Sequence, residues 1–307
     1  MKPKKIAVTT DFSESSRKTF PAAANCARTF GAELHVLHLA HIPPALISPW
    51  PEVGPYLVPD DFFGDAAKKL EEFVRSEEVF RSLDVRAAIV RGETVDALQE
   101  HLVLEEFDLL VMAPQGLSAM KRLLLGSFTD RMLRIAPCPV LVYRAPAEGE
   151  PPPFNPGRIL VPHDFSPPSR AALDLARDWA EGGGRSARLL FVVEHQASIY
   201  EYAARWEGTF QEHLARVHEE AQRRLKKHID ECWKGIEAEA LVVGGDPVEK
   251  ILAEAASWPA DLLVMGTHSK TGLERFLGGT TQTVIRRATC PVLVTPGRRG
   301  GEYPARG

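Results

Sequence analysis

The sequence predicts an α/β protein built from two tandem open parallel sheets, each with five strands and with helices on both faces. Two observations carry this prediction. Short apolar segments such as 262–265, bounded by polar residues or glycine, have the profile of strands buried on both faces of a parallel sheet. Segments with helical periodicity lie between these strands, and this alternation is typical of a parallel sheet covered by helices. The second observation is that the whole pattern occurs twice.

The repeat is defined by three pairs of matching segments that follow in the same order. Two pairs are offset by 153 residues and the third by 152. A nearly constant offset indicates tandem duplication of a unit of about 150 residues, which is a usual domain size. The pairs are 8–13 with 161–166, 108–113 with 261–266, and 138–142 with 290–294.

The duplication predicts the domain organisation. Residues 1–145 form the first domain (copy one), and residues 157–297 form the second (copy two). The segment 146–156 between them contains five prolines, which predicts a stiff, extended linker. The Gly- and Arg-rich residues 298–307 are expected to be a flexible tail.

Within copy one, five apolar segments predict the strands, and helices fit between them. A first helix is expected to bury the face formed by Phe20, Ala23, Ala24 and Ala27. The proline-rich segment 42–59 is expected to be a loop over the sheet edge. The five predicted strands are 5–10, 33–39, 85–90, 109–113 and 140–143.

Copy two repeats these elements with one difference. The region 200–233, which matches the proline-rich segment of copy one, has helical spacing of its apolar residues and is predicted to be mostly helix. Ser13 and Ser166 stand where helix N-caps belong, and Pro167 suits a first helical turn. The apolar residues of 200–233 are Leu214, Val217, Ala221, Leu225 and Ile229, and those of the first helix of copy two are Ala172, Leu175, Ala176 and Trp179.

Composition excludes several function classes. The net charge of -4 argues against a nucleic-acid binder that works by broad neutralisation of phosphates. No apolar run approaches the ~18 residues of a membrane-spanning helix. The four cysteines form no CxxC pair and the ten histidines no HExxH motif, so we expect a cytoplasmic protein without a protein-built metal site.

The candidate site lies where buried strands end. Asp11 and Asp164 end the first strand of each copy, and Ala113 and Gly266 end the fourth. If these strands are neighbours, the aspartate and the following glycine-rich loop face one crevice. A glycine loop that leads into a helix start presents unpaired amides to an anion. Copy two reads Gly266-x2-Ser269-x9-Gly279-Thr280, and copy one reads Ala113-x2-Gly116-x9-Gly126-Ser127.

These features resemble the universal stress protein family, over both copies and nearly the whole chain. Nucleotide-binding members of that family carry a loop G-x2-G-x9-G-[S/T] after the fourth strand. They also carry an aspartate after the first strand that helps to hold the adenosine part of ATP. The resemblance implies the Rossmann-like fold of the adenine nucleotide alpha hydrolases. It also implies that the two copies dock through their last strands, 140–143 and 292–294, so that one chain imitates a homodimer; a further homodimer is an open alternative.

Each copy departs from the family loop at a different place. Copy two has Ser269 at the middle glycine, and copy one has Ala113 at the first, followed by Pro114, which lacks a backbone donor. The register of the second loop stays open, because either Gly278 or Gly279 can correspond to Gly126. We rank copy two above copy one as the ATP site. The expected ligand-binding residues are Asp164, Gly266, His268, Ser269, Gly278, Gly279, Thr280 and Thr281 in copy two, and Asp11, Gly116, Gly126 and Ser127 in copy one.

Several other interpretations stand beside this one. The aspartates can be turn formers, and Lys270 and Arg275 can be an exposed charged face rather than partners of phosphate. The leading hypothesis is an ATP-binding regulatory module, to which Mg²⁺ arrives with the nucleotide. The alternatives are an interaction protein that binds no nucleotide, and a slow ATPase. The sequence gives little support for catalysis, because neither a P-loop nor a Ser-His-Asp grouping can be recognised in it.

Overall fold

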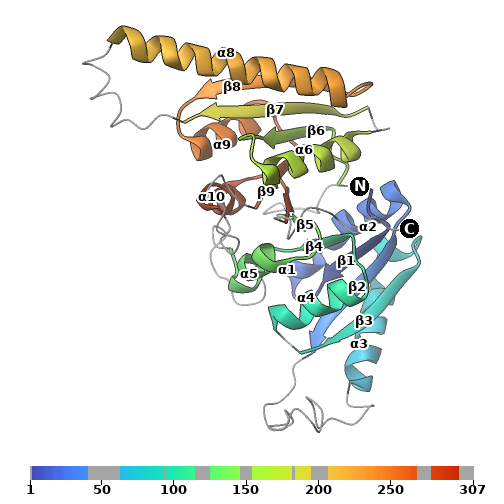
Figure 1. Cartoon of the computed structure of the whole chain (residues 1–307). Helices are drawn as coiled ribbons and strands as arrows, with labels where there is room; N and C mark the ends of the chain where they lie inside the picture. Colours follow the sequence, from blue (N-terminus) through green and yellow to red (C-terminus); the bar gives the residue numbers. More distant parts are fainter. Residues whose placement is uncertain are drawn as a thin grey trace. The chain divides into compact units, whose positions relative to one another are not determined.

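The structure is a computed structural model of the 307-residue chain. It describes residues 2–40, 63–92, 94–114, 125–145, 154–181, 184–194, 207–267 and 278–296, with only the helical backbone for 207–210. The predicted loop 42–59 therefore lies outside the described residues. The chain divides into two compact units between Phe154 and Asn155. In Figure 1, copy one runs from blue to green and copy two from yellow-green to red.

Copy one contains a five-stranded parallel sheet in the order β3-β2-β1-β4-β5. All five predicted strands are confirmed, with ends shifted by no more than one residue. The central residues of β1, β2, β4 and β5 are buried because helices cover both faces, whereas those of the edge strand β3 are partly exposed. The strands are β1 (Lys5–Thr9), β2 (Glu33–Ala40), β3 (Val85–Arg91), β4 (Leu109–Met112) and β5 (Val140–Val142), and the helices are α1 (Glu14–Arg17), α2 (Phe20–Phe30), α3 (Gly64–Ser76), η3 (Glu78–Phe80), α4 (Val95–Leu104) and α5 (Ser127–Ile135).

Copy two repeats this topology in the order β8-β7-β6-β9-β10, again with every described strand pair parallel. The duplication seen in the sequence is therefore a duplication of fold. The region predicted to be mostly helix is confirmed as α8. The elements are β6 (Arg158–Pro162), α6 (Pro167–Ala180), β7 (Ser186–Val193), α8 (Glu207–Cys232), β8 (Glu237–Gly244), α9 (Pro247–Ser257), β9 (Leu262–Gly266), α10 (Gly279–Arg287) and β10 (Val292–Thr295).

The helix starts follow the sequence signals. Ser13 and Ser166 are the N-caps of α1 and α6, and each hydroxyl accepts the amide three residues on, at 3.1 and 3.4 Å. Pro167 is the first residue of α6. The predicted apolar faces of α2 and α6 are buried, whereas α8 buries Ala221 and Leu225 fully and its other apolar positions in part.

One carboxylate in each copy joins the starts of two strands. Asp108, just before β4, accepts the backbone amides of Lys4 and Lys5 at 2.8 and 3.0 Å. Asp261, just before β9, accepts those of Gly157 and Arg158 at 3.0 and 2.8 Å. The two copies therefore use equivalent hydrogen bonds to join the start of the first strand to the start of the fourth strand.

Every helix in the described part of the chain is too short or too polar to cross a bilayer.

Candidate functional site

The strand order places a crevice beside the first strand of each copy. β6 pairs with β7 on one side and with β9 on the other, as β1 does with β2 and β4. The strand order reverses at this first strand. Ligands of open α/β sheets bind at such a point, at the carboxyl ends of the strands. The neighbouring first and fourth strands are the arrangement that the sequence argument required.

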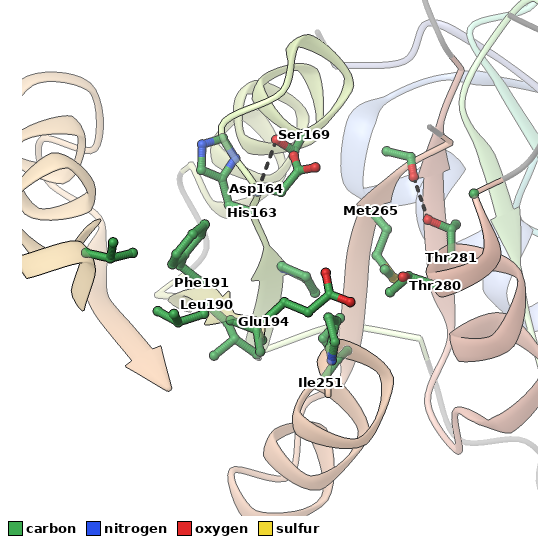
Figure 2. Close-up of a pocket in the computed structure, with 17 residues that line it drawn as sticks. His163, Asp164, Ser169, Leu190, Phe191, Glu194, Ile251, Met265, Thr280 and Thr281 are labelled. Atoms are coloured by element: carbon green, nitrogen blue, oxygen red, sulfur yellow. Dashed lines mark hydrogen bonds between the residues drawn. The ribbon is translucent and has the colours of Figure 1, made fainter. Parts of the chain in front are cut away.

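A cavity of about 530 Å³ occupies this position in copy two (Figure 2). Its polar lining comes from the ends of β6 and β7 and from the start of α10. Its apolar lining comes from β7, β9, α8 and α9. The residues that matter for the argument are Asp164, Glu194, Gly266, Gly278, Thr280 and Thr281, with His163, Phe191, Ile251 and Met265 around them.

Asp164 both shapes the turn after β6 and faces the cavity. Its Oδ1 accepts the amide of Ser166 at 3.0 Å, which is the turn-forming role expected of such an aspartate. Burial raises the pKa of Asp164, but hydrogen bonds from the Ser166 and Ser169 side chains and the Ser166 amide outweigh burial, and the pKa is lowered overall. The carboxylate is therefore ionised at neutral pH and available to accept further donors.

Gly266 has a packing role that the sequence argument did not foresee. A Cβ at this position would lie 2.7 Å from the carbonyl carbon and 2.8 Å from the oxygen of Pro168, in the first turn of α6. Helix α6 therefore lies on the side of Gly266 to which a side chain would project. Copy one carries Ala113 at this place, and the residue equivalent to Pro168 is Ser15.

Hydrogen bonds decide the register of the second loop. The amide of Gly126 donates to the carbonyl of Pro114 at 2.8 Å, and the amide of Gly278 donates to that of Thr267 at 2.7 Å. The hydroxyls of Thr129 and Thr281 make a second matching pair of contacts, to the carbonyls of Ala113 and Gly266. Gly278 is thus the counterpart of Gly126, and Gly279 takes the place of Ser127. The interpretation that aligned Gly279-Thr280 with the final G-[S/T] is wrong by one residue.

The predicted residues of copy two are partly brought together. Asp164, Gly266, Gly278, Thr280 and Thr281 line the one cavity. Gly279 is the exposed first residue of α10 and does not line it. His268 and Ser269 lie outside the described residues, as do Lys270 and Arg275.

In copy one, the described part of the predicted site keeps the same backbone. Asp11 accepts the amide of Ser13 at 3.0 Å, as Asp164 accepts that of Ser166. Gly126 caps α5, and Ser127 is the exposed first residue of that helix. Gly116 lies outside the described residues.

Sequence reasoning missed most of the cavity wall. Phe191 and Glu194 come from the end of β7, Ile251 from α9, and Val217 from α8. None of them belongs to a motif. The one available signal was position, because residues at the carboxyl end of β7, the strand beside β6, must border the same crevice.

His163, which directly precedes Asp164, is a further residue that the sequence did not mark. It lines the cavity with a relative exposure of 7%, and among the described residues its Nδ1 finds no hydrogen-bond partner. Burial lowers the pKa of His163 to about 4, so the ring is neutral at neutral pH. Copy one has Thr10 here, whose hydroxyl is paired with Ser16 at 3.1 Å.

A strained aromatic residue follows the aspartate in both copies. Phe12 and Phe165 have φ values of 62° and 63°, in the left-handed region, at a cost on the order of 1 kcal/mol each. The Phe165 ring packs on His163 and Phe191, with ring centroids 4.8 and 5.1 Å apart. This turn therefore fixes both the carboxylate and one aromatic wall beside the cavity.

Comparison with known families identifies the fold. The model of the universal stress protein family matches residues 2–144 and 156–296. The chain belongs to this family. It is a tandem member, because the family match occurs once in each copy.

Individual members of the universal stress protein family show how far the similarity extends. A universal stress protein of Mycobacterium tuberculosis is 29% identical over 253 residues, which cover 80% of each chain. One from Methanocaldococcus jannaschii is 35% identical over 139 residues, covering 45% of this chain and 80% of the relative. The crystal structure of a universal stress protein from Archaeoglobus fulgidus superposes with a TM-score of 0.64 at 22% identity, covering 95% of this chain and 96% of that one. That likeness supports the fold.

Proposed function

We propose that copy two binds an adenine nucleotide, with ATP as the expected ligand, and that the protein is a nucleotide-dependent regulatory module of the stress response. The observation that carries the proposal is one cavity bordered by Asp164, Gly266 and the start of α10. Its volume of about 530 Å³ is in the range of small-molecule sites. Apolar walls with a few polar groups suit a base and a sugar, and the free amides of a helix start suit a phosphate.

Magnesium fits the same cavity as a companion of the nucleotide. The cavity lining includes oxygen donors of the kind that Mg²⁺ prefers, among them the carboxylate of Asp164 and the hydroxyl of Thr280. Phosphate oxygens and water would supply most of the ligands of the ion, which would neutralise part of the phosphate charge.

The experiment compares equivalent aspartates. Calorimetric titration with ATP should give a measurable affinity for the wild type, and we expect Asp164→Ala to weaken it at least about tenfold, the cost of a lost hydrogen bond to a charged group. Asp11→Ala removes the matching carboxylate of copy one and should leave the titration unchanged. Absence of ATP binding by the wild type up to millimolar ligand would reject the proposal, and equal losses would move the site away from copy two.

An interaction protein that binds no nucleotide is the second candidate. It is favoured by Gly279, which puts a glycine where copy one has the hydroxyl of Ser127, and by the two carboxylates that line the cavity. Mass spectrometry of small molecules released from the purified, denatured protein separates the two. Bound adenine nucleotide would exclude this candidate. Slow ATP hydrolysis would be kept only if steady phosphate release disappears in Asp164→Ala.

Assembly is a separate proposal. Terminal strands such as β5 and β10 invite pairing with another strand or an apolar surface. Docking of the two copies through β5 and β10, with or without a further homodimer, is what the family resemblance implies. Light scattering gives the mass in solution, and cross-linking between the two strands tests the docking.

A further inference from the structure

Glu194 is a charged residue of the cavity that no motif includes. It directly follows β7, and its carboxylate extends into the cavity toward the part lined by Met265 and Thr280 (Figure 2). Thr280 is the second residue of α10, so this is also the part of the cavity nearest to the amides at that helix start. The carboxylate therefore shares the region in which phosphate is expected to bind.

Among the described residues, the charges around this region are unbalanced. Asp164 and Glu194 line the cavity, and none of its described lining residues is a lysine or an arginine. His163 adds no positive charge at neutral pH because the buried ring is neutral. The remaining lining is mostly apolar, and apolar walls reduce the screening of charges by water.

The attraction of the helix start does not cancel this charge. A helix N-terminus acts as roughly half a positive charge, whereas an ionised carboxylate carries a full negative charge. A phosphate placed at the start of α10 is thus drawn by the amides and repelled more strongly by Glu194 at a comparable distance. Each additional phosphate charge increases the repulsion, while a nucleoside without phosphate is not subject to it.

We propose that Glu194 sets the phosphate preference of the copy two site, lowering its affinity for adenine ligands in proportion to their phosphate charge. The inference rests on the proposed nucleotide function and specifies which ligands that site favours. The affinities of adenosine and AMP relative to that of ATP are then higher than the shape of the cavity alone would give.

The test is calorimetric titration of adenosine, AMP and ATP in buffer with EDTA, so that no metal neutralises the phosphates. Glu194→Gln keeps the size of the side chain and removes its charge. We expect ATP to bind this variant about tenfold more tightly, AMP about threefold, and adenosine equally, as for charges several ångströms apart in a partly screened site. Added salt should reduce the gain for ATP.

A matched control separates local charge from total charge. Glu237→Gln makes the same change at the exposed start of β8, at the opposite edge of the sheet from the cavity, and should alter none of the three affinities. Thermal unfolding of both variants verifies that they are folded. If wild-type protein binds ATP and Glu194→Gln leaves all affinities unchanged, or changes adenosine as much as ATP, the inference is overturned while the proposed function stands. If the wild type binds neither ATP nor adenosine, both fall together.

Discussion

The two copies share a backbone design but differ in the side chains placed on it. Both have the same strand order and the same aspartate turn with a strained phenylalanine. In both, a glycine amide donates a hydrogen bond to a carbonyl just after the fourth strand, from Gly126 to Pro114 in copy one and from Gly278 to Thr267 in copy two. The side chains around the crevice have changed. The equivalent pairs, with copy one first, are Thr10 and His163, His38 and Phe191, Ala113 and Gly266, and Ser127 and Gly279.

The opposite edge of the sheet shows that divergence is not a sign of function by itself. Copy one packs His35 and His101 against Phe107 there, with centroids 5.0 and 5.9 Å away. In copy two, the residues equivalent to these histidines are Arg188 and Glu254, which form an ion pair. Both solutions fill the same space far from the crevice. In the crevice of copy two, the changed side chains line a cavity of ligand size.

Acid should lower the free energy of unfolding of copy two because His163 must become protonated. Its pKa in the folded protein is about 4, below the ~6.5 of an unfolded chain, so the unfolded state binds more protons between these values. The stabilisation is complete above pH 6.5 and is lost as the pH falls toward 4, by on the order of 2 to 3 kcal/mol at pH 4.5. Urea unfolding at pH 7.5 and 4.5, followed by tryptophan fluorescence, measures this loss, because four of the five tryptophans lie in copy two.

The control takes the residue of copy one. His163→Thr introduces the side chain that Thr10 supplies in the equivalent turn, and it should remove most of the extra loss at low pH. Burial also lowers the pKa values of His35, His101 and His228, so some acid sensitivity should persist in the variant. An identical loss in wild type and His163→Thr would contradict the assignment to His163.

Gly266→Ala should destabilise copy two by about 2 kcal/mol. The added methyl overlaps the backbone of Pro168, and overpacking against rigid backbone costs amounts of this size. Urea unfolding at pH 7.5 gives the free energy change. The reciprocal variant, Ala113→Gly, relieves no overlap and should cost less than ~1 kcal/mol through chain entropy. Equal effects in the two copies would show that the close approach of α6 does not restrict this position.

Gly279→Ser, which introduces the residue of copy one, should have the smallest effect of these substitutions. A Cβ at Gly279 meets no atom within 4 Å, so the side chain of Ser127 can be introduced without a clash. If copy two holds phosphate at the start of α10, one added hydroxyl should raise ATP affinity roughly threefold, near the net worth of a hydrogen bond. Calorimetry measures the change, and Ser127→Gly in copy one, which should have no effect, is its control.

The sequence was informative wherever a local pattern determined the structure. Buried strands, Ser13 and Ser166 as caps, and the tandem repeat all have short-range signals, and the adjacency of β6 and β9 follows from fold rules. The cavity wall had no such signal, because Phe191, Glu194 and Ile251 converge from separate elements. The sequence left the register of Gly278 open, and the hydrogen bonds from Gly278 to Thr267 and from Thr281 to Gly266 determine it. The ligand-binding role of Gly266 stays a prediction, and the close approach of Pro168 to this glycine is a long-range contact that no local pattern encodes.

The two hydrogen bonds accepted by Asp261 have a practical consequence for preparing the two halves of the chain separately. The carboxylate of Asp261 holds the amides of Gly157 and Arg158, so the ordered beginning of the C-terminal half depends on a group more than one hundred positions downstream. A protease cut anywhere in 146–153 would leave both of these bonds in place, whereas a fragment starting at Ile159 would lose them. Separation of the halves for independent biophysical work should therefore be made upstream of Gly157.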